Sequence, residues 1–162
     1  MPAKAPTLHM ICGKIASGKS TLTQRLGREA HTVVISEDDW LKALFAEDMK
    51  TLRDFVRCSG KLRSAMAPHI VSLLRSGVSV VLDFQANTVD ARAWMRGIFE
   101  EAEAPHLLHV LDTPDEVCLA RLKARNAQGD HPFAVTEEEF ARVSQHFQPP
   151  APEEGFNVLI HQ

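Results

Sequence analysis

The stretch from Gly13 to Thr21 constrains the fold more than any other part of this 162-residue chain. It reads Gly-Lys-Ile-Ala-Ser-Gly-Lys-Ser-Thr and matches the pattern G-x-x-x-x-G-K-[ST]. An apolar run, Leu8–Cys12, precedes it directly, and a helical pattern continues after it toward Leu26. A strand, a glycine-rich turn and a helix in this order form a loop whose inward-pointing backbone N–H groups can hold phosphate. The sequence therefore predicts a phosphate-binding loop between the first strand and the first helix.

The side chains of this loop predict a Mg-nucleotide as its ligand. Lys19 is expected to bridge the β- and γ-phosphates, and the Ser20 hydroxyl is expected to ligate Mg²⁺. A glycine-rich turn that only caps a helix is the alternative, which the strand–loop–helix context disfavours. We therefore expect ATP and Mg²⁺ as cofactors, although no motif separates ATP from GTP. The expected phosphate-binding residues are Gly13, Lys14, Ala16, Ser17, Gly18, Lys19, Ser20 and Thr21.

Short apolar runs alternate with helical patterns along the whole chain. Most runs are almost continuously hydrophobic, which is typical of parallel strands covered on both faces. Strands that alternate with helices predict a three-layer α/β fold with right-handed crossovers. The expected strands are Leu8–Cys12, Thr32–Ile35, Val78–Leu82, His106–Leu111 and Phe156–His161.

Helix starts and one loop carry local signals. Thr113-Pro-Asp-Glu116 has the pattern of a capping box, with Thr113 as the N-cap and Pro114 at the first helical position. Thr136-Glu-Glu-Glu139 repeats that pattern. The proline-rich stretch 149–155 is expected to be a stiff loop that delivers the last strand.

The composition is that of an ordinary globular protein, with 44% hydrophobic and 24% charged residues. The length suits a single domain over residues 1–162. Eighteen basic against 21 acidic residues give a net charge of −3, which excludes a strongly basic surface devoted to nucleic acid. A local basic groove stays possible.

The sequence predicts a cytoplasmic protein. No apolar run approaches the ~18 residues that cross a bilayer, so no membrane partner is expected. The start, Met1–Pro6, lacks a secretory signal. Cys12, Cys58 and Cys118 are scattered and odd in number, which is typical of free thiols in a reducing compartment.

Carboxylates follow the second expected strand. Ser36 with Asp39 has a helix-cap pattern, so these acids could simply complement a helix N-terminus. Alternatively, Asp38 is a general base that removes a proton from a substrate hydroxyl as it attacks the γ-phosphate. We favour Asp38 over Asp39 for this role.

The third expected strand ends at Asp83. A carboxylate at this place could hold Mg²⁺ directly or through water. A local turn hydrogen bond is the equally open alternative. Asn87 and Thr88 are expected to start the next helix rather than contact substrate.

Arg121 and Arg125 lie four residues apart and share one helix face. A polar, glycine-containing segment, 126–132, follows them. We expect a mobile lid over about residues 121–136 whose arginines close over the phosphates. The alternative is that both arginines are solvated at the C-terminus of their helix.

Other side chains are less informative. A basic stripe at helical spacing could bind an anionic acceptor or nucleic acid, or be a solvated helix face. Trp40 could line an acceptor pocket, whereas Trp94 has core spacing. No histidine or cysteine pattern indicates a metal other than Mg²⁺. The stripe comprises Lys50, Arg53, Arg57 and Lys61.

Together these motifs resemble the P-loop kinase group that includes polynucleotide 5′-hydroxyl kinases, chloramphenicol phosphotransferases and zeta-toxin-type sugar-nucleotide kinases. The resemblance implies a five-stranded parallel sheet in the order 2-3-1-4-5, ATP over the phosphate loop and an acceptor near Asp38. It also implies that Asp38 is the base and that Arg121 and Arg125 are the lid arginines. The motifs are Gly13–Thr21, Ile35–Asp39, Val80–Asp83 with Asn87 and Arg92, and Arg121–Arg125.

The leading hypothesis is an ATP-dependent phosphotransferase that moves the γ-phosphoryl group to a hydroxyl of a small molecule. Its catalytic residues would be Lys19, Asp38, Arg121 and Arg125. A polynucleotide 5′-hydroxyl kinase is an alternative, weakened because Leu41 stands where such kinases typically carry arginine. A switch that binds a protein partner and hydrolyses ATP slowly is the other alternative. The sequence leaves the oligomeric state open.

Overall fold

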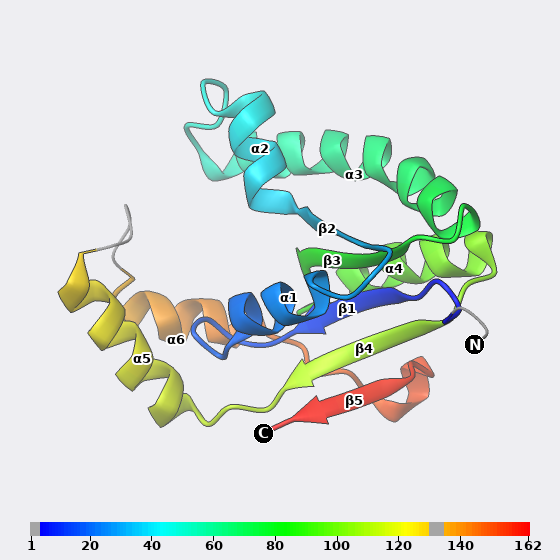
Figure 1. The fold of residues 1–162 in the computed structure, drawn as a ribbon. Helices are drawn as coiled ribbons and strands as arrows, with labels where there is room; N and C mark the ends of the chain where they lie inside the picture. The colour runs from blue at the N-terminus through cyan, green and yellow to red at the C-terminus, as the bar shows by residue number, and fades with distance from the viewer. Residues whose placement is uncertain (1–3, 130–134) are drawn as a thin grey trace.

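The computed structural model describes residues 4–129 and 135–162, and in them five parallel strands form one sheet. The strand order is β2-β3-β1-β4-β5, which confirms the predicted topology. All five strands point toward the same edge, away from the N-terminus (Figure 1). The strands are β1 (Leu8–Cys12), β2 (Thr32–Ser36), β3 (Ser79–Gln85), β4 (His106–Leu111) and β5 (Val158–His161).

Helices cover both faces of this sheet and extend past its carboxyl edge. α3 and α4 pack on one face and α1 lies on the other, while α5 and α6 lie beyond the ends of the strands (Figure 1). This arrangement confirms the predicted three-layer α/β fold. The helices are α1 (Lys19–Gly27), α2 (Glu37–Phe45), α3 (Leu52–Arg75), α4 (Val89–Ala102), α5 (Asp115–Gln128) and α6 (Glu137–Gln145), with a short 3₁₀ turn, η1 (Pro152–Glu154).

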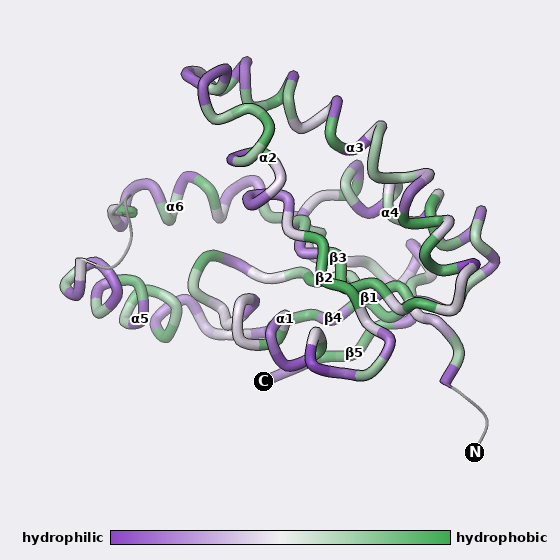
Figure 2. The backbone as a smooth tube through the Cα atoms, turned by 45° about the horizontal axis from the view of Figure 1, so that its top comes forward, coloured by the Kyte–Doolittle hydropathy of each residue, from purple (hydrophilic) through white to green (hydrophobic). Residues whose placement is uncertain are grey.

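The hydrophobic core follows the alternation of side chains along β1. Leu8, Met10 and Cys12 are completely buried in the larger cluster beneath α3 and α4. Ile11 points to the other face and packs with Leu22 of α1. The strands are the hydrophobic segments of the backbone, while the helices alternate in polarity (Figure 2). Burial raises the pKa of the Cys12 thiol to about 11, as befits a side chain that acts as a small hydrophobe.

The edge strands depart from the predicted burial on both faces. Val33 and Val34 of β2 and Val158, Leu159 and Ile160 of β5 are between 38% and 59% exposed. A strand at the edge of a sheet has a neighbouring strand on one side only, so its side chains stay partly exposed even where α1 approaches Val34 through Gly27. All five predicted strands therefore form, but the predicted burial on both faces holds for β1 and most of β3, for the middle of β4, and not for the two edge strands. None of the helices in the described part of the chain combines the length and apolar character needed to span a membrane.

Side-chain caps fix most helix starts. Ser36, Thr88 and Thr136 accept hydrogen bonds from the amides of Asp39, Ala91 and Glu139, which confirms those predicted starts. The predicted box at Thr113 is wrong, because α5 begins at Asp115 and its N-cap, Pro114, makes no side-chain bond. The Thr113 hydroxyl instead donates to the carbonyl of Ser17 at 2.9 Å.

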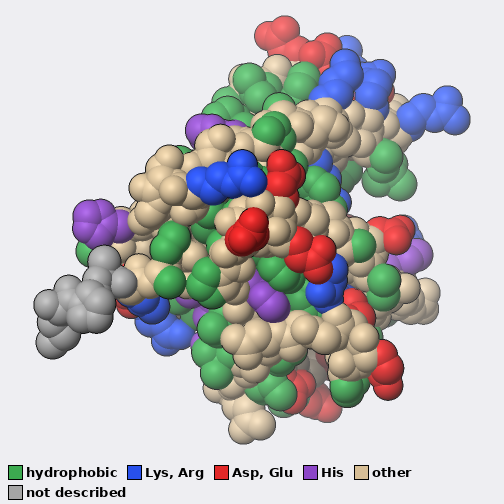
Figure 3. Space-filling model, turned by 90° about the vertical axis from the view of Figure 1, so that its right-hand side faces the viewer, with side chains coloured by type: hydrophobic (Ala, Val, Ile, Leu, Met, Phe, Trp, Pro, Cys, Tyr) green, Lys and Arg blue, Asp and Glu red, His purple; other side chains and the backbone are tan. Residues whose placement is uncertain are grey.

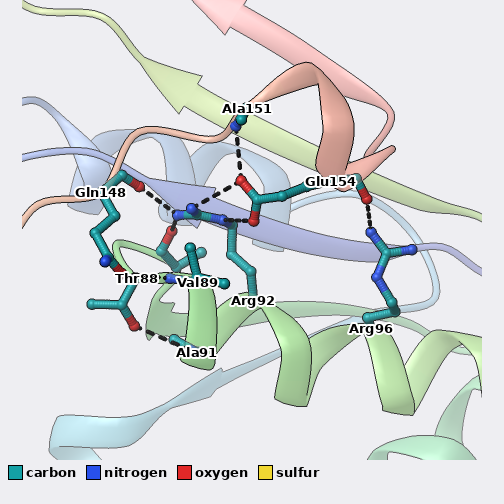
Figure 4. A network of polar contacts seen from close by, with 9 residues as sticks. Thr88, Val89, Ala91, Arg92, Arg96, Gln148, Ala151 and Glu154 are labelled. Carbon is teal, nitrogen blue, oxygen red and sulfur yellow. Dashed lines mark hydrogen bonds and ion pairs between the residues drawn. The ribbon is translucent and has the colours of Figure 1, made fainter.

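An ion pair in the interior anchors the segment that leads into β5. Arg92 of α4 is completely buried, and its Nε lies 2.9 Å from Oε1 of Glu154. The same guanidinium donates to the carbonyls of Ala86 and Gln148, and Glu154 also accepts from the amide of Ala151 (Figure 4). The ion pair between Arg92 and Glu154 thus holds the predicted stiff loop at 149–155 in place. The 3₁₀ turn η1 lies within this loop.

We expect Glu154→Gln to lower the free energy of unfolding by about 3 kcal/mol, because it leaves the Arg92 charge buried without its counter-ion. Urea denaturation measures the change. Glu153→Gln is the matched control, since Glu153 is an exposed neighbour, and it should change stability by less than about 0.5 kcal/mol. Equal losses in both variants would contradict the anchoring role.

Three histidines form a hydrogen-bonded row across β1, β4 and β5. His9 Nδ1 lies 2.9 Å from His109 Nε2, and His109 Nδ1 lies 2.9 Å from His161 Nε2. Burial, followed by the positive charge that its histidine neighbours would carry, lowers the pKa of His109 to about 4. Burial also lowers the pKa of His9 and of His161. The row is therefore neutral in the folded protein at neutral pH.

This row predicts a loss of stability on mild acidification. Below the unfolded-state pKa of about 6.5, His109 binds a proton in the unfolded chain but not in the folded protein. The free energy of unfolding therefore decreases as the pH is lowered. We expect about 2 kcal/mol to be lost between pH 7.5 and pH 5 through His109. Urea midpoints at the two pH values measure it. The loss should shrink in His109→Gln, and an unchanged pH dependence would contradict this assignment.

Candidate active site

The glycine-rich loop between β1 and α1 has the backbone geometry of a phosphate loop. Gly18 is the N-cap of α1 with φ +108°, and Ala16 also has a positive φ of 62°. A Cβ at Gly13 would lie 2.5 Å from the Ser17 hydroxyl and 3.1 Å from the Leu111 Cβ, so a side chain there would displace its neighbours. Lys19 Nζ donates to the carbonyls of Gly13 at 2.5 Å and Lys14 at 2.8 Å, which holds the lysine across the loop.

Asn87 fixes the start of this loop from the end of β3. Its Oδ1 accepts from the Gly13 amide and its Nδ2 donates to the Gly13 carbonyl, both at 2.9 Å. The Asn87 carbonyl in turn accepts from the amide of Gln148, which contacts the Arg92 anchor. The sequence indicated only that Asn87 begins a helix. Thr88 is the actual N-cap, and the side chain of Asn87 joins two strand ends.

A cavity of about 1140 Å³ opens along the carboxyl edge of the sheet, large enough for a nucleotide with a second small substrate. Every predicted catalytic residue lines it. Lys19 enters from the loop, Asp38 from α2, and Arg121 and Arg125 from α5. The lining also includes Ile15, Ala16, Ser17, Gly18, Ser20, Thr21, Leu22, Arg25, Glu37, Phe55, Arg63, Asp83, Gln85, Asn87, Thr88, Asp90, Ala91, Leu111, Thr113, His161 and Gln162.

Three acids follow β2, and in the described part of the chain Glu37 and Asp38 line the cavity while Asp39 does not. The amide of Asp39 is the one that the Ser36 hydroxyl caps, at 3.3 Å. Capping and lining are therefore divided between neighbouring residues. This geometry favours Asp38 over Asp39 as the group that faces a substrate.

Carboxylates gather where β2 and β3 end side by side, since Ser36 pairs with Asp83 in the sheet. Burial, and then the negative charge of Asp38, raises the pKa of Asp83, while Lys19 opposes the shift. Burial lowers the pKa of Lys19. The Ser20 hydroxyl lines the same cavity as these carboxylates. Hydroxyl and carboxylate oxygens are hard donors that suit Mg²⁺, and a divalent cation would relieve the repulsion between the carboxylates. Ser20 and Asp83 therefore fit the predicted metal role.

The arginines of α5 reach the phosphate loop from outside the sheet. Arg121 Nη1 lies 3.4 Å from the Ala16 carbonyl. Arg125 Nε is buried without a hydrogen-bond partner among the described residues. Both guanidinium groups are thus at the cavity rather than only at a solvated helix end. The expected lid covers about 121–136, of which residues 130–134 lie outside the described residues.

Two groups of residues that the sequence offered as acceptor-binding do not line the described part of the cavity. Trp40 is 39% exposed and does not line the cavity, whereas Trp94 packs against the main core as predicted. The basic stripe also lies elsewhere, on exposed positions of α3 and just before it. Its members are Lys50, Arg53, Arg57 and Lys61.

The face at the amino ends of the strands mixes acidic, basic and apolar side chains (Figure 3).

Three further residues of the cavity wall, Glu37, Phe55 and Arg63, carry no signal in the sequence. Glu37 is buried, although acids are rarely buried without a partner, and it accepts from Ser59 Oγ at 3.0 Å. Arg63 lies outside the periodic basic stripe, so its spacing gave no signal. Only the meeting of α2 with α3 brings these residues together.

A family model described as an AAA domain, AAA_33, matches residues 8–150 of the sequence. The chain belongs to this AAA_33 family. Its fold is that of P-loop kinases, as the sequence resemblance implied. No curated protein matches the sequence.

Solved structures share the AAA_33 fold at low identity. A candidate kinase from Chloroflexus aurantiacus has a TM-score of 0.72 and 23% identity, over 99% of this chain and 86% of that chain. The Mycobacterium tuberculosis APS kinase CysC, in complex with AMPPNP and APS, has a TM-score of 0.61 and 20% identity, over 98% and 90%. A chain of the Pnkp1/Rnl/Hen1 RNA repair complex has a TM-score of 0.69 and 19% identity, over 96% of this chain and 48% of that chain.

We expect Asn87→Ala to weaken Mg-ATP binding roughly tenfold, because two hydrogen bonds that shape the loop are lost at about 1 kcal/mol or less each. Isothermal titration calorimetry measures the dissociation constant. Asn157→Ala is the matched control, since Asn157 contacts His106 instead. Unchanged affinity in Asn87→Ala would show that the loop holds its shape without this clamp.

Proposed function

We propose that the protein is an ATP-dependent phosphotransferase that moves the γ-phosphoryl group to a hydroxyl of a small molecule. One observation carries this proposal: a single cavity contains the phosphate loop, the Asp38 carboxylate and two arginines of α5. Phosphoryl transfer needs these parts together, because it depends on positioning and on stabilising charge. The kinases among the similar structures support the same reaction class.

In this proposal each side chain has one task. Asp38 accepts the proton of the acceptor hydroxyl while that oxygen forms a bond to the γ-phosphorus, and the bond from this phosphorus to the β-phosphate oxygen breaks. Lys19 neutralises charge on the β- and γ-phosphates. Ser20 and Asp83 would hold Mg²⁺, which would supply further neutralisation of the phosphate charge.

Arg121 and Arg125 would stabilise the charge on the transferring group as α5 and the segment after it close. Arg121 already contacts the loop through Ala16, and Lys14 Nζ pairs with Asp115 at 2.9 Å. These contacts join the first turns of α5 to the loop. Through the contact of Arg121 with the loop, the position of the lid proposed for about 121–136 would depend on whether the phosphate site is occupied.

The position of the basic stripe favours a small acceptor over a polynucleotide. An oligonucleotide acceptor needs cations along the path of its backbone. The stripe residues Lys50, Arg53, Arg57 and Lys61 are exposed and do not line the described cavity. The polynucleotide alternative would require those residues to contact a strand that leaves the cavity.

We expect Asp38→Asn to lower acceptor-dependent phosphoryl transfer by about 100-fold or more, since general-base catalysis contributes 10² to 10⁴ in rate. The KM for ATP should stay within about twofold because Asp38 acts on the acceptor. ADP release with Mg-ATP over nucleosides, sugars, antibiotics and a 5′-hydroxyl oligonucleotide measures it.

Asp39→Asn is the control for this experiment, and it should keep wild-type transfer. Equal activity of Asp38→Asn and wild type toward the best acceptor would contradict the assignment of Asp38 as the general base. Slow ADP release that ignores every acceptor would favour the ATP-hydrolysing switch.

A further inference from the structure

Among the described residues of α2 and α3, one basic side chain lines the cavity. These helices contribute Glu37, Asp38, Phe55 and Arg63 to the cavity wall. Lys19 belongs to the phosphate loop and the other arginines to α1 and α5. Arg63 is therefore the cation on the same wall as the proposed base.

The guanidinium of Arg63 is held in a fixed place. Its Cζ lies 5.2 Å from the ring centroid of Trp94 and 6.0 Å from that of Phe84. Its Nε lies 3.6 Å from Oε2 of Glu37, and Ser59 Oγ donates to that same oxygen at 3.0 Å. Aromatic faces and a buried carboxylate thus position a cation that is only 28% exposed.

The contacts of Arg63 leave its hydrogen-bonding capacity unused. A guanidinium carries five N–H donors. The 3.6 Å separation from Glu37 is too long for a hydrogen bond, and Nε is buried without a partner among the described residues. The part of the guanidinium that reaches the cavity makes no hydrogen bond among the described residues, so a ligand that accepts from its Nη groups would gain affinity.

We propose that Arg63 binds an anionic group of the acceptor, so that the substrate is a small hydroxyl compound that also carries a carboxylate or a phosphate. This inference rests on the proposed function and names its substrate class. The planar guanidinium matches both groups in a bidentate way. Phe55 supplies apolar surface beside the site, and Asp38 receives the hydroxyl proton.

A purely structural role is the competing explanation, in which Arg63 only holds Glu37 in place. That role predicts the same loss for every acceptor when Arg63 is changed. Binding of an anionic group predicts a loss confined to anionic acceptors. The two explanations therefore differ in acceptor preference and not in overall activity.

Paired acceptors test the preference. Glycerate is compared with glycerol, and gluconate with glucose, for the carboxylate. Glycerol 3-phosphate and glucose 6-phosphate are compared with the same neutral compounds for the phosphate. We expect wild type to favour the better anionic class by at least about tenfold in kcat/KM.

Arg63→Gln should lower kcat/KM for that class by about 30-fold or more through KM, and leave the neutral compounds and ATP unchanged. Arg63→Lys should restore part of the loss. Arg75→Gln is the matched control on the same helix, since Arg75 donates to the Glu101 carbonyl and does not line the described cavity. Equal preference in wild type, or an equal loss for charged and neutral acceptors, overturns the proposal.

A binding measurement separates this inference from the proposed function. In a Trp40→Phe background the fluorescence reports Trp94, the ring against Arg63, and saturating Mg-AMPPNP keeps the probes off the phosphate loop. We expect saturable changes with the anionic compounds or inorganic phosphate, and none after Arg63→Gln.

Anion binding that depends on Arg63, without transfer to any compound, would support the anion site and contradict the phosphotransferase. Transfer that prefers neutral acceptors would support the phosphotransferase and contradict the anion site. No fluorescence change with any anion would overturn the anion site.

Discussion

The buried ion pair between Arg92 and Glu154 is the interaction on which the site depends. It connects α4 to the segment before β5, and it places the carbonyls of Ala86 and Gln148 around one guanidinium. Asn87, between these groups, is thereby set to hold both the amide and the carbonyl of Gly13. A chain of hydrogen bonds thus links the phosphate loop to Gln148 and Glu154, near the end of the sequence.

The fold was predictable from local features of the sequence. The loop motif fixed the first strand and helix, and apolar runs located the other strands, because buried parallel strands need continuous hydrophobic sequence. The bounds of β1 and β4 are as predicted, whereas β3 continues past Leu82 to Gln85. At the edge strands the same runs located the strands but not their burial, since Val33 and Leu159 resemble core residues in sequence yet are 40% and 46% exposed.

The site was predictable only where one residue carries its own signal. Lys19 and Ser20 lie within a motif, and Asp38 and Asp83 follow strands, so their approach to a common edge follows from the topology. Glu37 and Arg63 become neighbours only through packing of α2 on α3, which no spacing reveals. Thr113 shows the opposite error, because a capping pattern there concealed a hydroxyl that contacts the phosphate loop at Ser17.

The charges of the cavity are divided between its two sides. Carboxylates gather on the side of β2 and β3, where burial and Asp38 raise the pKa of Asp83, while cations come from the phosphate loop and α5. In the proposed reaction the γ-phosphoryl group moves from the cationic region to a hydroxyl held beside the carboxylates. The most direct test of this account is to follow γ-phosphoryl transfer from Mg-ATP in ¹⁸O-labelled water with a pool of hydroxyl acceptors. The account predicts a phosphate ester without ¹⁸O as the main product, whereas ¹⁸O-labelled inorganic phosphate without any ester would contradict it.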